Sequence, residues 1–166
     1  MSDISSVTGE PFYSGTWGDI QDVLRVLNIG EGKMAMVTQP MVNRYQEMID
    51  RDIDAILQDT YQTPIRAFNL IGLQGIQGAG PVTRVFPGDV RRAARYWTAG
   101  QILVNEFQQL ESNITEQATQ MVSDARMQVF AFSRPNHRIP GQRRKSNISR
   151  TMPAGLQPSA FPERPV

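Results

Sequence analysis

Residues 38–60 read TQPMVNRYQEMIDRDIDAILQDT, and their spacing decides the fold class. Thr38 can cap a helix, and Pro40 suits a first helical turn, where its missing N–H is no loss. Apolar residues then recur at three- and four-residue steps, which predicts an amphipathic helix over about 40–59. The apolar face of this helix consists of Met41, Val42, Tyr45, Met48, Ile49, Ile53, Ile56 and Leu57.

Three further segments show helical spacing. One is predicted to begin at Thr16, with Asp19 three residues later as its N-cap partner, and to stop near residues 28–30. A second is predicted from residues 87–89 to about 110, and a third from about 114 to 130. Together with the 40–59 helix, they predict a mainly α fold, a small bundle of about four helices over residues 16–132.

A long connection, residues 61–87, interrupts the predicted bundle. Two apolar arms, 65–73 and 82–86, flank the glycine run GLQGIQGAG at 72–80, which predicts a long Gly-rich loop or an irregular β-hairpin. The run lacks the lysine of a phosphate-binding loop and the third glycine of a dinucleotide-binding fingerprint. We therefore interpret it as a mobile loop tip.

The two ends of the chain differ from the predicted bundle. Residues 1–15 are polar and contain glycine, which predicts an extended N-terminal arm that is mobile or held by a partner. Residues 133–166 hold six prolines and carry seven basic residues against one acidic residue, a charge of +6. Residues 1–132 carry ten basic and fifteen acidic residues, a charge of −5, which agrees with the net charge of +1 for the whole chain. The sequence therefore predicts an extended basic C-terminal arm on a mildly acidic body.

Groups that would support catalysis or metal binding are scarce. The chain has no cysteine, which excludes a disulfide framework, a thiolate zinc site and a cysteine nucleophile. His137 is the single histidine, and it lies in the C-terminal arm without an expected pocket. We therefore expect no enzyme activity, no cofactor and no metal. No apolar run approaches the roughly 20 residues that span a bilayer, and the first residues do not resemble a secretory signal, so no membrane partner is expected.

The acidic stretch DRDID at 50–54 has two interpretations. A calcium-binding EF-hand loop would need a glycine at its sixth position and a glutamate at its twelfth, and the chain has neither there. On a helix, Asp50 and Asp54 share a face while Asp52 points elsewhere, so the three carboxylates cannot converge on a cation. The preferred interpretation is a solvated or subunit-facing acidic stripe.

The C-terminal arm has three interpretations. Its cations could neutralise the phosphates of a nucleic acid, with release of counterions. Its spaced apolar residues could instead anchor the arm on a protein surface, which we favour because phosphate binding alone would not need them; a passive tail is the third. The candidate docking residues are Arg134, Arg138, Ile139, Arg143, Arg144, Lys145, Ile148, Arg150, Met152, Leu156 and Phe161.

The order of residues in three places resembles the head–tail connector (adaptor) proteins of tailed phages. These places are Ile49-Asp50 followed by IDAIL at 53–57, YQTPI at 61–65, and Pro87 followed by VRRAA at 90–94. The resemblance covers about residues 38–110, and the Gly-rich insertion and the basic arm depart from it. It implies a small helical bundle that forms a ring of about twelve copies beneath the portal of a DNA-filled capsid.

The resemblance also implies a structural virion protein at the head–tail junction, assembled in the host cytoplasm. Its partners would be copies of itself, the portal protein, the next neck or tail protein, and viral DNA that passes through the channel without specific recognition. The C-terminal arm would dock on the portal. From the charges of this chain we add the hypothesis that an acidic stripe faces the channel and repels DNA, with members Asp50, Asp52, Asp54 and Asp59. The loop would contact a neighbouring subunit or the next ring through Phe68, Leu70, Ile71, Leu73, Gly75, Ile76, Gly78, Gly80 and Val82.

Two other function classes stay open. A small helical nucleic-acid-binding protein would use the same basic arm, and its binding would weaken steeply with salt. An enzyme subunit or a regulatory helical domain would take its missing chemical groups from a partner. A ring of copies of the chain would favour the connector over both.

Overall fold

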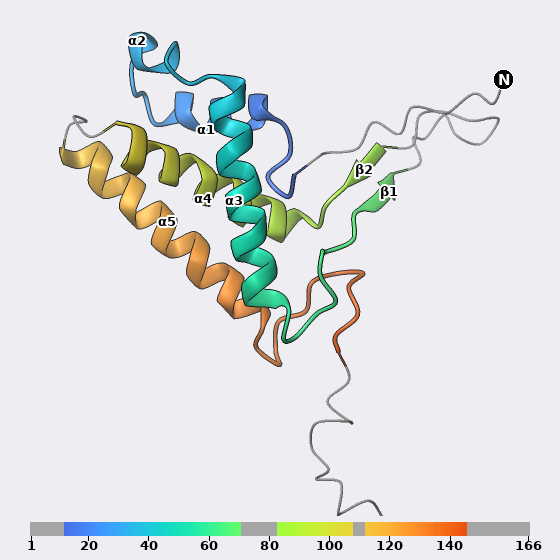
Figure 1. The fold of residues 1–166 in the computed structure, drawn as a ribbon. Helices are drawn as coiled ribbons and strands as arrows, with labels where there is room; N and C mark the ends of the chain where they lie inside the picture. The colour runs from blue at the N-terminus through green and yellow to red at the C-terminus, as the bar shows by residue number, and fades with distance from the viewer. Residues whose placement is uncertain (1–11, 71–82, 108–111, 146–166) are drawn as a thin grey trace, which may run out of the picture.

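The computed structural model describes residues 12–70, 83–107 and 112–145, which are mainly helical (Figure 1). The predicted fold class, a small helical bundle, is therefore confirmed. One short helix, Glu31–Met34, was not predicted. No helix in these described ranges is long and apolar enough to cross a bilayer. The elements in chain order are α1 (Trp17–Val26), α2 (Glu31–Met34), α3 (Gln39–Leu57), β1 (Phe68–Leu70), β2 (Thr83–Val85), α4 (Gly88–Glu106) and α5 (Ser112–Phe132).

Local hydrogen bonding explains where α1 begins. The Thr16 side chain accepts a hydrogen bond from the Asp19 backbone N–H at 3.4 Å. In return, the Asp19 carboxylate accepts one from the Thr16 backbone N–H at 2.7 Å. This reciprocal capping box satisfies two N–H groups that the helix itself leaves free, so the predicted N-cap is confirmed. The helix ends before Asn28, whose φ of 55° is left-handed.

The helix predicted over 40–59 is α3, and its apolar spacing places one face in the core. Met48 is an exception, because 40% of its surface is exposed, which corrects its assignment to the buried face. Gln46 is buried although it is polar, and its side chain contacts the N-terminal segment described below. The buried residues of α3 are Val42, Tyr45, Gln46, Ile49, Ile53 and Leu57.

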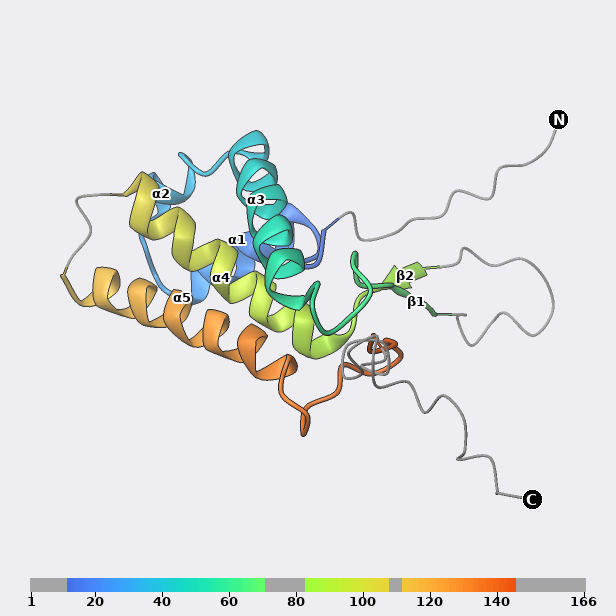
Figure 2. The ribbon, with the colours of Figure 1, turned by 60° about the horizontal axis from the view of Figure 1, so that its bottom comes forward.

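Helix α4 lies between α3 and α5 and also contacts α1 (Figure 2). The two long helices α4 and α5 approach each other closely at Gly100. A Cβ atom at that position would lie 2.8 Å from Val122 Cγ2 and 2.9 Å from the Ala118 carbonyl oxygen. A glycine is therefore required by the contact between these two helices.

Two buried apolar clusters fill the space around α4. One contains Tyr61 and Trp97 and joins α3, α4 and the C-terminal half of α5. The other contains Leu24 and Leu103 and joins α1, α3 and α4. Burial of each side chain of this size contributes about 1.5–3 kcal/mol, so these clusters are the main source of stability.

The two short strands pair antiparallel at the base of the predicted loop. Phe68 lies opposite Val85, and Leu70 lies opposite Thr83. The backbone of the two apolar arms is therefore paired where the chain leaves and re-enters the bundle. The remaining predicted contact residues of the loop lie outside the described residues: Ile71, Leu73, Gly75, Ile76, Gly78, Gly80 and Val82.

The predicted boundaries of both terminal arms are corrected, because each predicted arm includes residues that contact the bundle. At the N-terminus, Tyr13 and Ser14 are buried in the bundle, which corrects the expectation of an extended arm up to residue 15. At the C-terminus, residues 133–145 fold back against the bundle: Ile139 is 2% exposed, and the Lys145 backbone N–H donates to the Thr60 carbonyl at 2.8 Å. An arm starting at residue 133 is therefore wrong for these thirteen residues, and residues 146–166 lie outside the described part.

Candidate functional site

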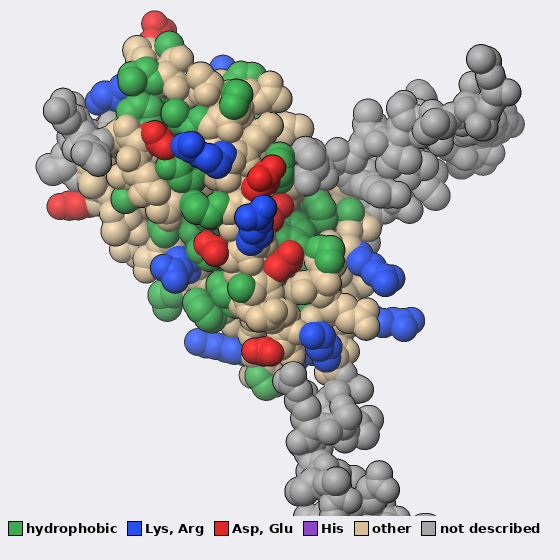
Figure 3. Space-filling view, in the orientation of Figure 1, with side chains coloured by type: hydrophobic (Ala, Val, Ile, Leu, Met, Phe, Trp, Pro, Cys, Tyr) green, Lys and Arg blue, Asp and Glu red, His purple; other side chains and the backbone are tan. Residues whose placement is uncertain are grey.

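A groove beside Phe130, between α4 and α5, leaves apolar side chains uncovered. We define this Phe130 groove by Gln101, Val104, Val122, Arg126, Met127 and Phe130, and its volume is about 450 Å³. Phe130 is 52% exposed and Met127 is 65% exposed. Figure 3 shows hydrophobic side chains exposed over α5. Exposed apolar surface of this kind favours association with a partner, because its contact with water is unfavourable.

The Phe130 groove was missed from the sequence, although a signal for it exists. The buried face of α5 includes Ala118, Ala125 and Val129. Met127 and Phe130 are apolar but fall outside the helical spacing of that face. Apolar residues on the otherwise polar side of an amphipathic helix therefore indicated a second, uncovered surface.

Residues 133–145, here called the C-terminal strap, fold around the buried side chain of Tyr61. The Tyr61 hydroxyl accepts hydrogen bonds from the Ile139 backbone N–H at 3.2 Å and from Arg144 Nε at 3.3 Å. It lies 3.1 Å from the Phe132 carbonyl oxygen, to which it can donate. The backbone N–H of Lys145 donates to the Thr60 carbonyl at 2.8 Å, which closes the strap on the end of α3.

Arg144 is held inside the strap by carbonyl oxygens. Its guanidinium lies over the Tyr61 ring, 5.4 Å from the centroid. It donates to the Phe132 carbonyl at 3.3 Å and to the Pro135 carbonyl at 3.4 Å, and further to the carbonyls of Arg134 and His137. A cation that satisfies several carbonyls at once fixes the loop conformation, because each charge-assisted bond is stronger than a neutral one.

The predicted docking residues therefore divide into inward and outward groups. Ile139 and Arg144 contact the body of their own chain, which corrects their assignment to a partner surface. Lys145 Nζ donates to the Gln58 carbonyl. The side chains of the outward group are exposed and form no ion pair within the described ranges: Arg134, Arg138 and Arg143. The remaining five lie outside the described residues: Ile148, Arg150, Met152, Leu156 and Phe161.

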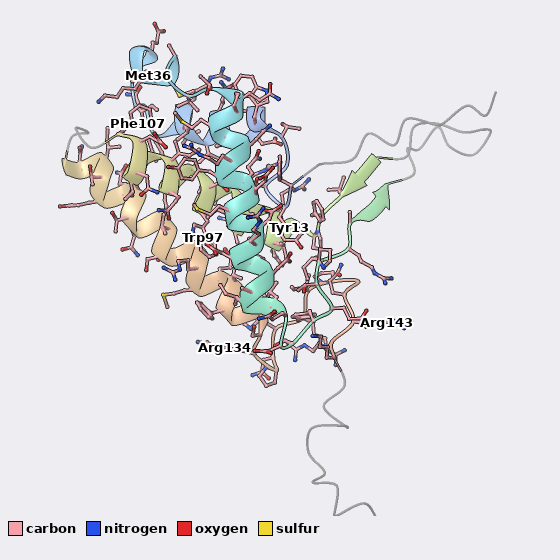
Figure 4. All side chains as sticks on the ribbon, in the orientation of Figure 1. Tyr13, Met36, Trp97, Phe107, Arg134 and Arg143 are labelled. Atoms are coloured by element: carbon pink, nitrogen blue, oxygen red, sulfur yellow. The ribbon has the colours of Figure 1, made fainter. Side chains whose placement is uncertain are left out.

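The outward arginines place positive charge at one end of the bundle. Arg134 and Arg143 both lie at the end where α3 and α5 finish (Figure 4). We call this set, Arg134, Arg138 and Arg143, the basic end. Because the strap finishes at Lys145, the chain continues into residues 146–166 from beside the basic end.

The N-terminal segment binds α3 through Tyr13, which lies beside that helix in Figure 4. The Tyr13 hydroxyl donates to Asp54 Oδ1 at 2.6 Å and accepts from the Ile65 backbone N–H at 2.8 Å. The Tyr13 backbone N–H donates to Asp50 Oδ2 at 3.2 Å. The Tyr13 ring packs edge-on against Phe86 with centroids 4.9 Å apart. One side chain thus joins the N-terminus, α3 and both sides of the loop.

A second set of contacts follows directly at Ser14. The buried Gln46 side chain donates to Ser14 Oγ at 2.7 Å, and Arg95 Nε donates to the Ser14 carbonyl at 2.8 Å. Arg95 also forms a 3.1 Å ion pair with Asp19. Buried polar groups that are paired in this way hold residues 13–15 between α3 and α4.

The predicted acidic stripe is divided by the Tyr13 contacts. Asp50 and Asp54 are partly buried and hydrogen-bonded to Tyr13, so they are not members of a solvated stripe, whereas Asp52 and Asp59 are exposed. Burial raises the pKa of Asp50 to about 7; the hydrogen bond from Tyr13 opposes this rise, and the nearby charge of Asp54 adds to it. Burial also raises the pKa of Asp54, against the lowering effect of the Tyr13 hydroxyl.

The candidate sites are therefore surfaces and buried contacts of the chain itself. Among the residues that the structure describes, no group of three or more His, Asp or Glu side chains could hold a metal ion. The Phe130 groove and the basic end are exposed features that a partner can reach. Comparison of the chain with protein-family models, with curated proteins and with solved structures found no significant match.

Proposed function

We propose that this chain is a structural virion protein, a head–tail connector adaptor of a tailed bacteriophage. In this proposal about twelve copies form a ring that joins the portal to the next neck or tail component. The observation that carries the proposal is the Phe130 groove, an uncovered apolar surface on a bundle that buries two other apolar clusters. A surface of this kind is costly to leave in water and favours association with protein.

The basic end supports the docking part of the proposal. Arg134, Arg138 and Arg143 are exposed without an ion-pair partner in the described ranges, and an acidic surface on the portal would complement them. Residues 146–166 continue from this end and bring the spaced apolar residues of the predicted arm with them. The arm would thus dock with charge at its base and apolar anchors along its length.

DNA passage needs a channel surface that does not retain phosphate. Residues 1–132 carry a net charge of −5, and Asp52 and Asp59 are exposed carboxylates on and after α3. In the proposed ring these groups face the channel and repel DNA, so the DNA slides through without specific recognition. Asp50 and Asp54 have no part in this role because Tyr13 binds them.

Portal binding tests the docking role of the basic end. We expect a chain with Arg134→Glu, Arg138→Glu and Arg143→Glu to bind purified portal at least about 10-fold more weakly, because three favourable charges become unfavourable. A chain ending at Lys145 shows how much residues 146–166 contribute to the affinity for the portal. The matched control is Arg51→Glu, an exposed cation of α3 outside the basic end. Equal portal affinity for the triple variant and the control would contradict the docking role.

The same exposed arginines favour a second candidate function, nucleic-acid binding. In that case the logarithm of DNA affinity would fall with the logarithm of salt concentration by about 0.9 for each phosphate neutralised. The triple arginine variant would then lower this slope by up to about 3, measured by fluorescence anisotropy with duplex DNA. For the connector we expect DNA binding that is weak and the same for the triple variant and for Arg51→Glu.

A further inference from the structure

A second uncovered apolar surface surrounds Tyr96. It consists of two adjoining depressions of about 230 and 250 Å³, both of which Tyr96 lines. We define this Tyr96 surface by Val23, Val26, Leu27, Tyr96, Met121 and Asp124. Val26 is 85% exposed and Tyr96 is 40% exposed. The chain therefore has two apolar surfaces that its own described residues leave uncovered.

The two surfaces lie on opposite sides of the contact between α4 and α5. On α5, Met121 and Asp124 line the Tyr96 surface, whereas Arg126 and Phe130 line the Phe130 groove. Their spacing of 100° per residue puts these pairs on different sides of the helix. A subunit with binding surfaces on two sides can contact two neighbours at once.

The charges of the two surfaces differ in sign. Among the described residues, the only charged one that lines the Phe130 groove is Arg126, whose guanidinium lies 5.6 Å from the centroid of the Trp97 ring. The Tyr96 surface is lined by three carboxylates, of Asp19, Asp22 and Asp124, against two guanidiniums, of Arg92 and Arg95, a net charge of −1.

Ion pairs within the described residues leave Asp124 and Arg92 of the Tyr96 surface unpaired. Asp19 pairs with Arg95 and Asp22 with Arg25, each at 3.1 Å. Among the described residues, Asp124 accepts a hydrogen bond from Gln120 at 2.7 Å, and the guanidinium of Arg92 lies over the Tyr96 ring, 5.8 Å from its centroid. Arg126 of one copy therefore complements Asp124 of another. Two grooves facing each other would instead bring Arg126 against Arg126.

We propose that the Phe130 groove of one copy binds the Tyr96 surface of a second copy. This inference rests on the proposed ring and names its subunit interface. A contact between two different surfaces is head to tail, and it generates a closed ring when the rotation between subunits closes. A contact of one surface with itself would stop at a dimer, which leaves the other surface in water.

Two single substitutions and their mixture test the interface. Val26→Glu damages the Tyr96 surface, and Met127→Glu damages the Phe130 groove; both side chains are more than half exposed, at 85% and 65%, so the fold is preserved. We expect each variant alone to associate at least about 30-fold more weakly than the unchanged chain, because a carboxylate is placed in the apolar contact. Mixed in equal amounts, the two variants retain one intact pair of surfaces. We therefore expect a 1:1 dimer that grows no further.

The measurement is sedimentation velocity with native mass spectrometry on full chains, with circular dichroism as a check on folding. Met48→Glu is the control, because Met48 is 40% exposed on α3 and lines neither surface. An unchanged chain that stays monomeric at every concentration would overturn the ring and this interface together. A ring that survives both substitutions would overturn the interface alone. If the Val26→Glu variant associates as strongly as the unchanged chain, the grooves of two copies bind each other. If a chain ending at Lys145 no longer associates, residues 146–166 fill the groove. Either result overturns the proposal.

Discussion

A chain that ends at Phe132 is expected to lose at least about 3 kcal/mol of its free energy of unfolding. This truncation removes Ile139, which is 2% exposed, and uncovers Tyr61, which is fully buried. It also removes the hydrogen bonds that Ile139 and Arg144 donate to the Tyr61 hydroxyl. A chain that ends at Lys145 keeps all of these contacts and is expected to unfold as the full chain does. The free energies of unfolding of both truncated chains are measured by urea denaturation monitored by circular dichroism.

Substitutions at two neighbouring arginines distinguish the role of the strap in stability from the role of the basic end in portal binding. Arg144→Ala is expected to destabilise the chain by about 2 kcal/mol, because the carbonyls of Phe132, Arg134 and His137 lose their common donor. Arg143→Ala is the matched control, since Arg143 is exposed and its side chain forms no ion pair in the described ranges. Equal unfolding free energies for the two variants would show that the strap does not depend on Arg144. Portal binding should follow the opposite order, with Arg143→Ala the weaker binder.

The second large effect is the dependence of stability on pH. Burial raises the pKa of Asp50 from 3.8 to about 7, so the folded chain holds this proton more tightly than the unfolded chain does. The stabilisation is complete below about pH 4 and is lost as the pH rises through about 7. Asp54 changes stability in the same direction, because burial raises its pKa as well.

Asp50→Asn should remove most of this dependence. Its amide oxygen can still accept from the Tyr13 backbone N–H, and the amide needs no proton to be neutral. We expect the free energy of unfolding of the variant to exceed that of the unchanged chain by at least about 2 kcal/mol at pH 8 and to equal it near pH 4. Asp52→Asn is the control, because Asp52 is exposed on the same helix. Parallel stability profiles for the unchanged chain and Asp50→Asn, from thermal unfolding between pH 4 and 8, would contradict the role assigned to Asp50.

The helices could be predicted because their signals are local. The apolar spacing of residues 38–60 and the capping pair Thr16 and Asp19 act within a few residues of sequence, so no distant contact was needed to place α3 and α1. The ends of the arms were missed for the opposite reason. Tyr13 binds Asp54 across 41 residues of sequence, and Arg144 binds Tyr61 across 83. No spacing rule connects positions so far apart.

The candidate site could likewise be predicted only where its signals are local. The basic end is visible in the sequence as a run of cations, because exposed charge needs no partner to be recognised. Which of these cations stay exposed is not visible, since Arg143 and Arg144 are identical in type and adjacent in sequence. One is exposed, and the other is enclosed by carbonyl oxygens. Asp50 and Asp52 also differ in exposure, because Asp50 is partly buried against Tyr13 and Asp52 is exposed.

By itself, the sequence determined that the chain is a small helical bundle with a basic C-terminal segment and without cysteine chemistry. Periodicity and composition carry that information because they are properties of short segments. The tertiary structure alone decided which polar groups are buried, where the strap closes on Tyr61, and which apolar side chains remain uncovered beside Phe130 and Tyr96. These outcomes depend on how α4 packs against its neighbours, since a side chain is buried or exposed only in relation to residues that the fold brings to it.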